Sequence, residues 1–510
     1  MAIYGQFKYS EELYGLSDPA GYIRWAVEID WNRDLIFDGT NESSRMFDIS
    51  VNRGRKTMLK STGAGFQTIP PGTCVFKLRN NDGRYNAWNQ DSPLYPYVMY
   101  GPEVRIRVMD QATNVIYPVF AGNIVDIRPY GYGANAYVTI KVEDRSRYLR
   151  KYGARTPLST GLTPGQAIEA ILNDVNWPTH WGRSIDSSTG TMNYHWASGD
   201  KKAWSECEDV AQSFLGLFFI SADGKATFID RNSEPASVLD LTQAVLLKDI
   251  DNPQPYEYRR NVTRLKVHPR TLGTTSVIYS VVGDPILVEA GDRRTVWANY
   301  SYNNQRVPAQ DIETPVASTD YLANTNDDGS GTDKTADCTM TVTDFGDNAK
   351  VVFENTGATN FYVTTRQIRG KPLYEEDSDD VIYPQDPSTV DDPSEFVQDL
   401  KWQQSVNVAV DYSQVLGEFL DRQNPFPVVK VRGRPDIQFA ADIFNVANLD
   451  LEELGFVGGS FRVGGIEHKS MIDTCQDIET TFYLEPYLAT TDAWTWPIED
   501  FGTDTVFGAG

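Results

Sequence analysis

The segment from residue 22 to residue 150 consists of short runs that alternate apolar and polar residues, and this pattern limits the possible folds more than any other feature. Glycine, asparagine, aspartate and proline separate the runs, as they do at turns between β-strands. In VRIRVMD, Arg105 and Arg107 alternate with valine and isoleucine, so one face enters a core and the other meets water or a partner. The pattern predicts a sandwich or small barrel, with strands at RWAVEIDW, TCVFKLRN, VRIRVMD, PVFAGNIVDIRPY and AYVTIKVED.

Helical spacing replaces this alternation after residue 160. The stretch Thr163-Pro164-Gly165-Gln166 is a capping box with proline at the first helical position, and the helix is expected to stop at Trp177-Pro178. A second helix is predicted over 202–215, followed by a β-hairpin that turns at 222–225. We therefore expect a compact α+β unit over 151–235.

The second half of the chain returns to strands. RNVTRLKVH and SVIYSVVG predict two of them, and alternating segments over 313–374 suggest a small inserted β-sandwich. An acidic, proline-bearing stretch over 375–395 is interpreted as a solvated connector, and a further helix is expected over 412–422. The segments PFPVVKVRG, FRVGGIEHKS and IETTFYLEP predict the closing strands.

Size and charge exclude several classes of protein. At 510 residues the chain exceeds what one hydrophobic core usually supports, so several domains are expected. The formal charge of −24 gives tight binding to a phosphate backbone no electrostatic basis. The start lacks a basic flank before an apolar core, and the longest strongly apolar run, Phe214 to Ile220, is far shorter than the ~20 residues of a membrane helix. We expect neither a standard secretion signal nor a membrane span.

One acidic turn resembles a calcium loop. Asp30-x-Asn32-x-Asp34 and Asp38 occupy ligand positions one, three, five and nine. However, Leu35 stands where the loop needs glycine, and Asn41 stands where a bidentate glutamate belongs. We interpret the segment as a polar β-turn and predict no metal, cofactor-binding or catalytic residue.

Other motifs also favour structural interpretations. Gly131-x-Gly133-x-x-Ala136 resembles a dinucleotide fingerprint, but strands flank it on both sides, which indicates a hairpin turn. No GxSxG or GxxxxGK[ST] motif occurs. The four histidines lack the spacing of paired zinc ligands, and the scattered cysteines are typical of small buried residues. These residues are His180, His195, His268 and His468, and Cys74, Cys207, Cys338 and Cys475.

An aromatic cluster near the predicted helices admits two interpretations. Its rings could stack on sugars, although aromatic residues near helix starts more often belong to a core. The cluster comprises Trp177, Trp181, Tyr194, Trp196 and Trp204. The sequence as a whole indicates an acidic, β-rich protein that packs against other proteins, without a constellation that would make an enzyme.

An ordered series of stretches runs from about residue 4 to residue 490. It includes Tyr4-Gly5 and Tyr14-Gly15, Asp30-Trp31, Arg53-Gly54-Arg55, Leu78 to Val108, FAGNIVDIRP, VTIKVEDRSRYLR, the capped helix, the hairpin that ends in Phe228-Ile229-Asp230-Arg231, FRVGGIEHKS and TTFYLEP. Taken together, the series resembles the baseplate hub, or tail-tip minor tail protein, of long-tailed, siphovirus-like bacteriophages. It departs from that pattern at DWNRDLIFDG, which lacks the Asp-Gly-Asp-Gly run common in relatives.

The resemblance implies a mainly β, multidomain hub with an α+β insertion. Two β-barrel domains of the tube type, a helix-hairpin domain and an inserted small β-sandwich are expected. The implied divisions are 1–150 for the first barrel with an N-terminal arm, 151–235 for the helix-hairpin domain, 236–312 with 375–490 for the second barrel, 313–374 for the sandwich and 491–510 for an extended C-terminal arm.

The resemblance also implies an assembly. Such hubs form homotrimers whose two barrels per chain give a pseudo-sixfold ring, which matches a hexameric tail tube above and a trimeric tip below. The implied partners are distal tail and tail tube proteins, the tape measure protein and tail fibre or tip proteins. The implied location is the tail tip of the virion after synthesis in the host cytoplasm, with DNA passing through the lumen without specific binding.

Two other functions remain open from the sequence. The aromatic cluster motivates a tail protein that binds or degrades carbohydrate on the host surface. The inserted sandwich motivates a module for adhesion to the host or to a partner.

Overall fold

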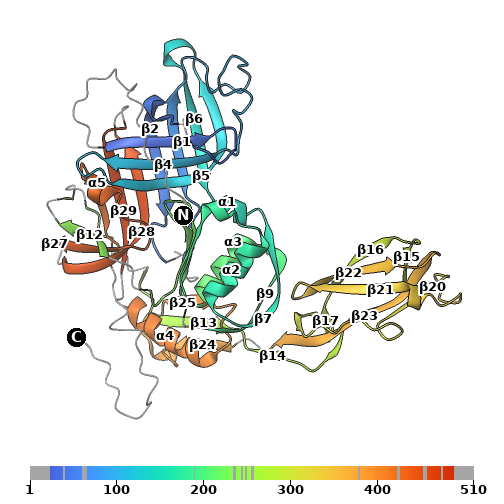
Figure 1. Ribbon diagram of the computed structural model, residues 1–510. Helices are drawn as coiled ribbons and strands as arrows, with labels where there is room; N and C mark the ends of the chain where they lie inside the picture. The colour runs from blue at the N-terminus through green and yellow to red at the C-terminus, as the bar shows by residue number, and fades with distance from the viewer. Residues whose placement is uncertain are drawn as a thin grey trace.

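The computed structural model describes residues 23–37, 41–59, 66–188, 190–233, 237–242, 245–246, 250–253, 258–376, 379–421, 425–451, 456–471 and 475–486. The expected N-terminal and C-terminal arms and Asp38 lie outside these residues. Within them, strands predominate and helices are few, which confirms a mainly β fold. Figure 1 shows two β units side by side, a helix-containing unit next to them, and a β-sandwich that projects away from the rest.

The first β unit is an antiparallel sheet in the order β1-β4-β5-β6-β3-β2. Its strands are β1 (Ile23–Asp30), β2 (Met46–Gly54), β3 (Thr73–Arg79), β4 (Glu103–Asp110), β5 (Ile116–Tyr130) and β6 (Tyr137–Asp144). The five strands expected here are confirmed, whereas β2 was not expected. On β4 the predicted alternation holds, because Val104, Ile106 and Val108 are fully buried.

This sheet curls around one core but does not close. Val27 of β1 and Val51 of β2 belong to the same hydrophobic cluster although their strands lie at opposite ends of the unit. A sheet whose first and last strands share a core must curve strongly. The second edge of β2 pairs with β28 (Phe456–Ser470) and not with β1. Among the described residues the expected barrel is therefore not found as a closed ring.

The second β unit has its own core. It contains β26 (Val428–Arg432), β29 (Ile478–Pro486), β28, β27 (Val446–Leu451) and β12 (Ser237–Thr242), with the short helix α5 (Pro435–Gln438) after β26. Strand β12 runs parallel to β27, and the other pairs are antiparallel. Leu241, Val429 and Phe482 are fully buried in this core.

The long strand β28 joins the two units into one sheet. Its first part pairs with β27 and its later part pairs with β2, while β29 occupies its other edge. The crossing is close: Gly54 has a φ of 81°, and a Cβ atom there would lie 2.3 Å from the carbonyl oxygen of Gly464. Only glycine accepts both that φ and that approach without strain.

A buried ion pair stands beside this crossing. The Arg55 guanidinium donates from Nε and from its second terminal nitrogen to the Glu485 carboxylate, at 2.8 Å and 2.9 Å. The Arg55 and Glu485 side chains are only 8% and 4% exposed. Two parallel hydrogen bonds satisfy both charges in a site that water does not reach. The pair therefore ties the segment after β2 to the end of β29.

The helix-containing unit follows the first sheet. It contains α1 (Ser146–Leu149), β7 (Gly153–Leu162), α2 (Pro164–Asp174), β8 (Arg183–Ile185), β9 (Met192–Lys202), α3 (Ala203–Ser213), β10 (Leu217–Ile220) and β11 (Ala226–Ile229). The predicted capping box is confirmed: the Gln166 N–H donates to Thr163 Oγ1, and the Thr163 N–H donates to Gln166 Oε1. The predicted hairpin is also confirmed, as β10 pairs antiparallel with β11.

The projecting sandwich consists of two sheets. One contains β14 (Arg270–Leu272), β15 (Ser276–Val288), β19 (Ala309–Gln310), β20 (Tyr321–Asn324) and β23 (Phe361–Glu375); the other contains β16 (Arg293–Asn299), β21 (Cys338–Asp344) and β22 (Asn348–Asn355), and a small β17 (Ser301–Tyr302) and β18 (Gln305–Arg306) hairpin lies beside them. Phe353 and Phe361 are fully buried between the sheets. Strands that precede residue 313 thus pair with strands of the expected insertion, and the domain boundaries remain a prediction.

The acidic stretch after the sandwich is more structured than expected. It contains β24 (Asp379–Tyr383) and reaches β25 (Glu395–Asp399), and both strands pair with β13 (Val262–Val267). The interpretation as a solvated connector was therefore wrong for β24, where Val381 is buried against the core that includes Leu265. Helix α4 (Val406–Leu420) begins six residues before the predicted start, because the Ser405 side chain accepts the Val408 N–H as its cap.

Short 3₁₀ helices connect several strands: η1 (Ser43–Arg45), η2 (Gly133–Asn135), η3 (Thr179–Trp181), η5 (Thr335–Asp337) and η6 (Pro387–Thr389). In the described parts of the chain, no helix has the length and apolar character needed to cross a membrane.

Breaking the buried ion pair tests the junction of the two units. Glu485→Gln leaves Arg55 buried without its carboxylate, which costs about 3–5 kcal/mol and should lower the thermal midpoint by roughly 10 °C in differential scanning calorimetry. Glu354→Gln is the matched control, because its partner Arg293 is 67% exposed and exposed pairs contribute about 1 kcal/mol or less. Equal midpoints for the two variants would contradict a supporting role for the pair.

Candidate functional site

The structure supports a polar β-turn at the acidic segment after β1. The Asp30 carboxylate is 1% exposed, and its two oxygens accept the backbone N–H groups of Asp34 and Leu35 at 3.1 Å and 3.0 Å. The Asn32 amide donates to the Asp34 carboxylate at 2.7 Å. These oxygens hold the turn together and do not converge on a common point. Nowhere in the described ranges do three or more His, Cys, Asp or Glu side chains form a group that could hold a metal ion.

The Gly131 to Ala136 motif is the turn between β5 and β6, as predicted. Gly131 and Gly133 have φ values of 70° and 63°, and the Ala136 N–H donates to the Gly133 carbonyl. The turn is followed by a strand, so it lacks the helix N-terminus that binds a pyrophosphate.

The tryptophan cluster belongs to a core. Trp177, Trp181 and Trp204 are 2%, 7% and 5% exposed, and they pack with α2, α3 and β10 in one hydrophobic cluster. Rings at this depth have no free face on which a sugar could stack. The structure therefore gives no support to the carbohydrate function that the cluster motivated.

The cysteines and histidines are dispersed. All four cysteines are free and buried, as predicted, and burial raises the pKa of the Cys338 thiol to about 12, so it stays protonated and unreactive. Burial lowers the pKa of His195 and of His468 to about 3, so both are neutral. His180 contacts Glu103 at 2.9 Å. It lies in η3 of the helix-containing unit, and 88 positions separate it from His268 in the sequence.

Large apolar side chains are instead exposed on three loops at one end of the first β unit. The loop after β1 contributes Leu35 and Ile36, the β5–β6 turn contributes Tyr132, and the long β3–β4 loop contributes most of the rest. We call this set the aromatic loop surface: Leu35, Ile36, Trp88, Tyr95, Tyr97, Met99, Tyr100 and Tyr132. Trp88 is 95% exposed, Tyr132 91% and Tyr100 73%.

Hydrogen bonds to backbone carbonyl groups hold the three loops together. The Arg33 guanidinium donates to the Tyr100 carbonyl at 2.6 Å, which connects the first loop to the long one. The Asn80 N–H donates to the Ala136 carbonyl at 2.8 Å, which connects the long loop to the β5–β6 turn. The aromatic loop surface is thus one structure formed by neighbouring loops.

The β3–β4 loop is built as a series of turns. Backbone N–H groups donate to the carbonyl three residues earlier at Gly83, Asn86, Asn89, Ser92 and Tyr95, over 3.0–3.1 Å. Asparagine side chains reinforce the series, since the Asn89 amide donates to the Gly83 carbonyl. Consecutive turns of this kind fix the backbone without a regular strand or helix. Trp88 is therefore presented from an ordered loop.

A buried carboxylate anchors the same loop from below. Glu42 is 3% exposed and accepts hydrogen bonds from the Tyr85 hydroxyl at 2.5 Å, Arg84 at 3.1 Å and the Trp31 indole at 3.3 Å. Burial, followed by the nearby Glu42 charge, raises the pKa of Tyr85, so this hydroxyl remains a donor. The contacts attach the loop to the β1 side of the sheet.

An ordered surface of this composition is suited to binding another protein. Tryptophan, tyrosine and methionine are enriched at protein interfaces, and aromatic side chains held in place lose little entropy on binding. The sequence carries a signal for these residues: Trp88 and the tyrosines lie among Asn, Asp, Gly and Pro, where no strand or helix can bury them. The sequence interpretation missed these residues as functional candidates.

His268, between β13 and β14, lies where the sandwich joins the body. Both of its ring nitrogens take part in hydrogen bonds. Nδ1 lies 2.5 Å from Glu375 of the sandwich, and Nε2 lies 2.6 Å from Asp399 at the end of β25. Hydrogen bonds to Asp399 and Glu375 raise the pKa of His268 to about 9. The imidazolium thus links the base of the sandwich to the body at neutral pH.

This link predicts that the stability of the junction between the sandwich and the body depends on pH. Because the folded pKa is raised from 6.5 to about 9, the contribution of His268 to stability is complete below about pH 6.5 and is lost as pH rises through about 9. Hydrogen exchange of β14 and the end of β23, corrected for the intrinsic rate, should accelerate between pH 7 and pH 10. His268→Gln should remove this pH dependence, whereas His180→Gln should keep it. A pH dependence that survives His268→Gln would exclude this assignment.

Comparisons with known proteins give likenesses of structure. No family model matches the chain, and no curated protein matches it. It is similar to the 43 kDa tail protein of prophage MuSo2 from Shewanella oneidensis, with 9% identity, coverage of 91% of this chain and 98% of that chain, and a TM-score of 0.49. It is also similar to a tail protein from Neisseria meningitidis, with 10% identity, 91% and 96% coverage and a TM-score of 0.48.

A prophage tail protein from Listeria monocytogenes is similar at 9% identity, with 90% and 94% coverage and a TM-score of 0.39. These three solved structures are all described as tail proteins.

Proposed function

We propose that the protein is a structural hub at the tail tip of a long-tailed bacteriophage. In this proposal three copies form a ring around the DNA channel, with the hexameric tail tube on one side and the trimeric tip on the other. The neighbours of the ring are distal tail and tail tube proteins, the tape measure protein, and tail fibre or tip proteins. The protein is made in the host cytoplasm and then becomes part of the virion.

The observation that carries the proposal is the union of two curved β units in one sheet. Each unit curls around its own core, and β2 and β28 fix the angle between them. Three such chains would place six curved units around an axis, which is the number needed to contact a sixfold tube. The sequence resemblance to phage hubs supports the same arrangement.

The aromatic loop surface supplies a contact region for this assembly. It lies at one end of the first β unit, so in a ring of three chains it would occur three times on equivalent positions. An ordered, exposed Trp88 is the kind of side chain that dominates an interface when a partner covers it. We assign this surface to contact with a neighbouring tail protein.

Charge supports passage of DNA without binding. The formal charge of −24 per chain would give a trimer a charge of three times that value. DNA binding depends largely on phosphate contacts with lysine and arginine, and a strongly acidic ring disfavours such contacts. DNA would therefore slide through the channel.

The oligomeric state tests the hub directly. Mass photometry of the purified full chain should give a particle of three times 57.2 kDa, and negative-stain images of tails labelled with an antibody against the chain should show it at the tip. A stable monomer that is absent from the tip would refute the proposal.

Substitution of Trp88 tests the contact region. Trp88→Ser should leave the fold intact, because the side chain is 95% exposed, but should reduce incorporation into tails at least tenfold if the residue behaves as an interface hot spot worth about 2 kcal/mol or more. Incorporation is measured as the amount of the protein in purified tails by quantitative mass spectrometry.

Val282→Ser is the matched control, since Val282 is 74% exposed on the sandwich and should not affect incorporation. Normal incorporation of the Trp88→Ser protein would refute the assignment of the aromatic loop surface to contact with a neighbouring tail protein.

A further inference from the structure

The β-sandwich is connected to the rest of the chain by two neighbouring strands. The chain enters the sandwich between β13 and β14 and leaves it after β23. The two crossings lie side by side, because Arg270 of β14 pairs with Glu375 at the end of β23. Two-stranded ribbons twist more strongly than wide sheets and have little stability of their own. The base of the sandwich thus has the form of a hinge.

The hydrophobic cores on the two sides of this connection are separate. Among the residues that the structure describes, the hydrophobic cluster of the sandwich contains no side chain of the helix-containing unit, and the cluster of that unit contains none of the sandwich. Units that lack a large apolar interface move relative to each other unless other contacts hold them. The position of the sandwich therefore depends on the polar contacts across the boundary.

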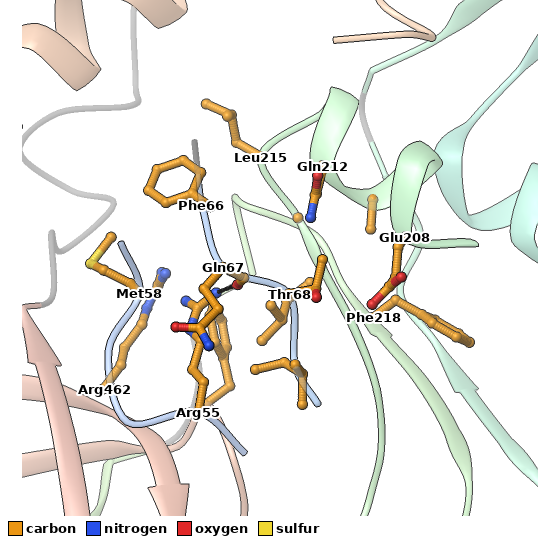
Figure 2. A pocket seen from close by; sticks show the side chains of 15 residues that line it. Arg55, Met58, Phe66, Gln67, Thr68, Glu208, Gln212, Leu215, Phe218 and Arg462 are labelled. Carbon is orange, nitrogen blue, oxygen red and sulfur yellow. Dashed lines mark hydrogen bonds between the residues drawn. The ribbon is translucent and has the colours of Figure 1, made fainter. Parts of the chain in front are cut away.

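The boundary between the helix-containing unit and the two β units is different, because it is apolar. One hydrophobic cluster there combines Phe219 of β10 with Ile69, which precedes β3, and with Phe444 of the second β unit. Figure 2 shows further apolar side chains around a small cavity at this boundary, among them Leu215 and Phe218. Burial of such side chains from three units resists relative motion. These three units therefore form one rigid body, to which the sandwich is attached.

Two contacts hold the sandwich against β7 and β9 of the helix-containing unit. The Arg155 guanidinium of β7 lies over the Trp297 ring of β16, 4.7 Å from its centroid. Nη1 of Arg306 in the sandwich donates to the Asp200 carboxylate of β9 at 2.8 Å. We call these two contacts the clasp. Trp297, Arg306 and Asp200 are 51%, 43% and 63% exposed, so water competes for both contacts. At exposed sites each contact of this kind favours one position only about two- to fivefold.

Arg270 lies at the connection itself. Its guanidinium lies over the rings of Trp196 and Trp402, 5.1 Å and 5.2 Å from their centroids, and donates to the Lys401 carbonyl at 2.8 Å. The Arg270 side chain is only 4% exposed, so these contacts are shielded from water. Because Arg270 belongs to the two-stranded connection, a rotation of the sandwich about that connection displaces it little. Arg270 is therefore suited to be the pivot.

We infer that the sandwich is a hinged arm that the clasp holds against β7 and β9. When the clasp opens, the arm rotates about Arg270 and the two chain crossings while the rest of the body keeps its structure. β23 has 15 residues and spans about 50 Å at roughly 3.3 Å per residue. Figure 1 shows β20 at the end of the sandwich that lies away from the body, so a small rotation at the base moves the loop after β20 a long way. This inference does not depend on the proposed hub function.

Distances between two spin labels test the inference in the full chain. Double electron–electron resonance is measured between Asp327→Cys, in the loop after β20, and Glu169→Cys on α2. Both positions are exposed, and the native cysteines are buried, so the labels attach at the introduced sites. The chain with an intact clasp should give one main distance and a minor second distance.

Removal of the clasp should shift these populations. Arg155→Gln combined with Asp200→Asn removes both clasp contacts and leaves Arg306 paired with Asp347 inside the sandwich. The ratio of the second population to the main one should rise about tenfold, the product of two factors of about two to five. A ratio that stays unchanged would overturn the inference.

Arg293→Gln combined with Glu354→Gln is the matched control. It also removes one positive and one negative side chain, but this exposed pair lies wholly within the sandwich. Its population ratio should equal that of the chain with an intact clasp. An increase as large as that of the clasp variant would show that loss of surface charge, and not release of the arm, changes the distances, and would overturn the inference.

A steric variant opens the arm without a change in the clasp. Gly346, between β21 and β22, has a φ of 86°, and a Cβ atom there would lie 2.9 Å from Trp196 Cβ and 3.1 Å from the Thr156 carbonyl oxygen. Asparagine tolerates a positive φ better than most residues. Gly346→Asn should therefore push the sandwich away from β7 and β9 and raise the second population at least about tenfold, as loss of the clasp does.

Gly291→Asn is the matched control for the steric variant, since Gly291 has a φ of 74° and no atom within 4 Å of a Cβ placed there. Its distances should match those of the chain with an intact clasp. A folded Gly346→Asn protein that keeps the original distances would overturn the inference. If circular dichroism shows that Gly346→Asn does not fold, the clasp variant alone decides.

Discussion

The ladder between β2 and β28 is the contact on which the rest of the architecture depends. It joins residues near position 50 to residues near position 467, and the helix-containing unit and the sandwich lie between them in sequence. The approach at Gly54 and Gly464 excludes any side chain, and the adjacent Arg55–Glu485 pair satisfies two buried charges. The glycine approach and the two Arg55–Glu485 hydrogen bonds each form only over a short distance and at one geometry. Because both must form together, they fix one relative orientation of the two β units.

The sequence predicts those helices and strands that are determined by neighbouring residues in the chain. The capping box at Thr163 sets the start of α2, and the alternation in β4 identifies its buried face. The acidic stretch misled because a short buried strand around Val381 is enclosed by charged residues and prolines. The pairing of β2 with β28 could not be predicted, since a strand records which face is buried but not which distant strand lies at its edge. For the same reason, alternation alone did not distinguish an open, curled sheet from a closed barrel.

For the candidate site, too, the sequence indicates the kind of residue involved but not which of these residues are exposed. Composition indicates a protein rich in interface residues, yet the cluster around Trp177, which motivated a carbohydrate function, belongs to a core. The exposed rings lie in the β3–β4 loop, where repeated asparagine and glycine turns prevent burial. The exposure of these rings depends on the contacts that hold the β3–β4 loop in place. One such contact is the hydrogen bond from Tyr85 to Glu42, a residue more than forty positions earlier in the sequence. A single sequence does not reveal such support.

The separation of β2 and β28 has a consequence for biosynthesis. A ribosome that adds about 5–20 residues per second needs roughly 20–80 s between releasing β2 and releasing its partner. During that interval the edge of β2 that later pairs with β28 is uncovered, and uncovered edges invite association with other chains. The end of β2 reads Asn52-Arg53-Gly54, a polar, charged and glycine-terminated sequence that pairs poorly with arbitrary strands. The residues that later permit the close crossing thus also protect the nascent chain while it waits.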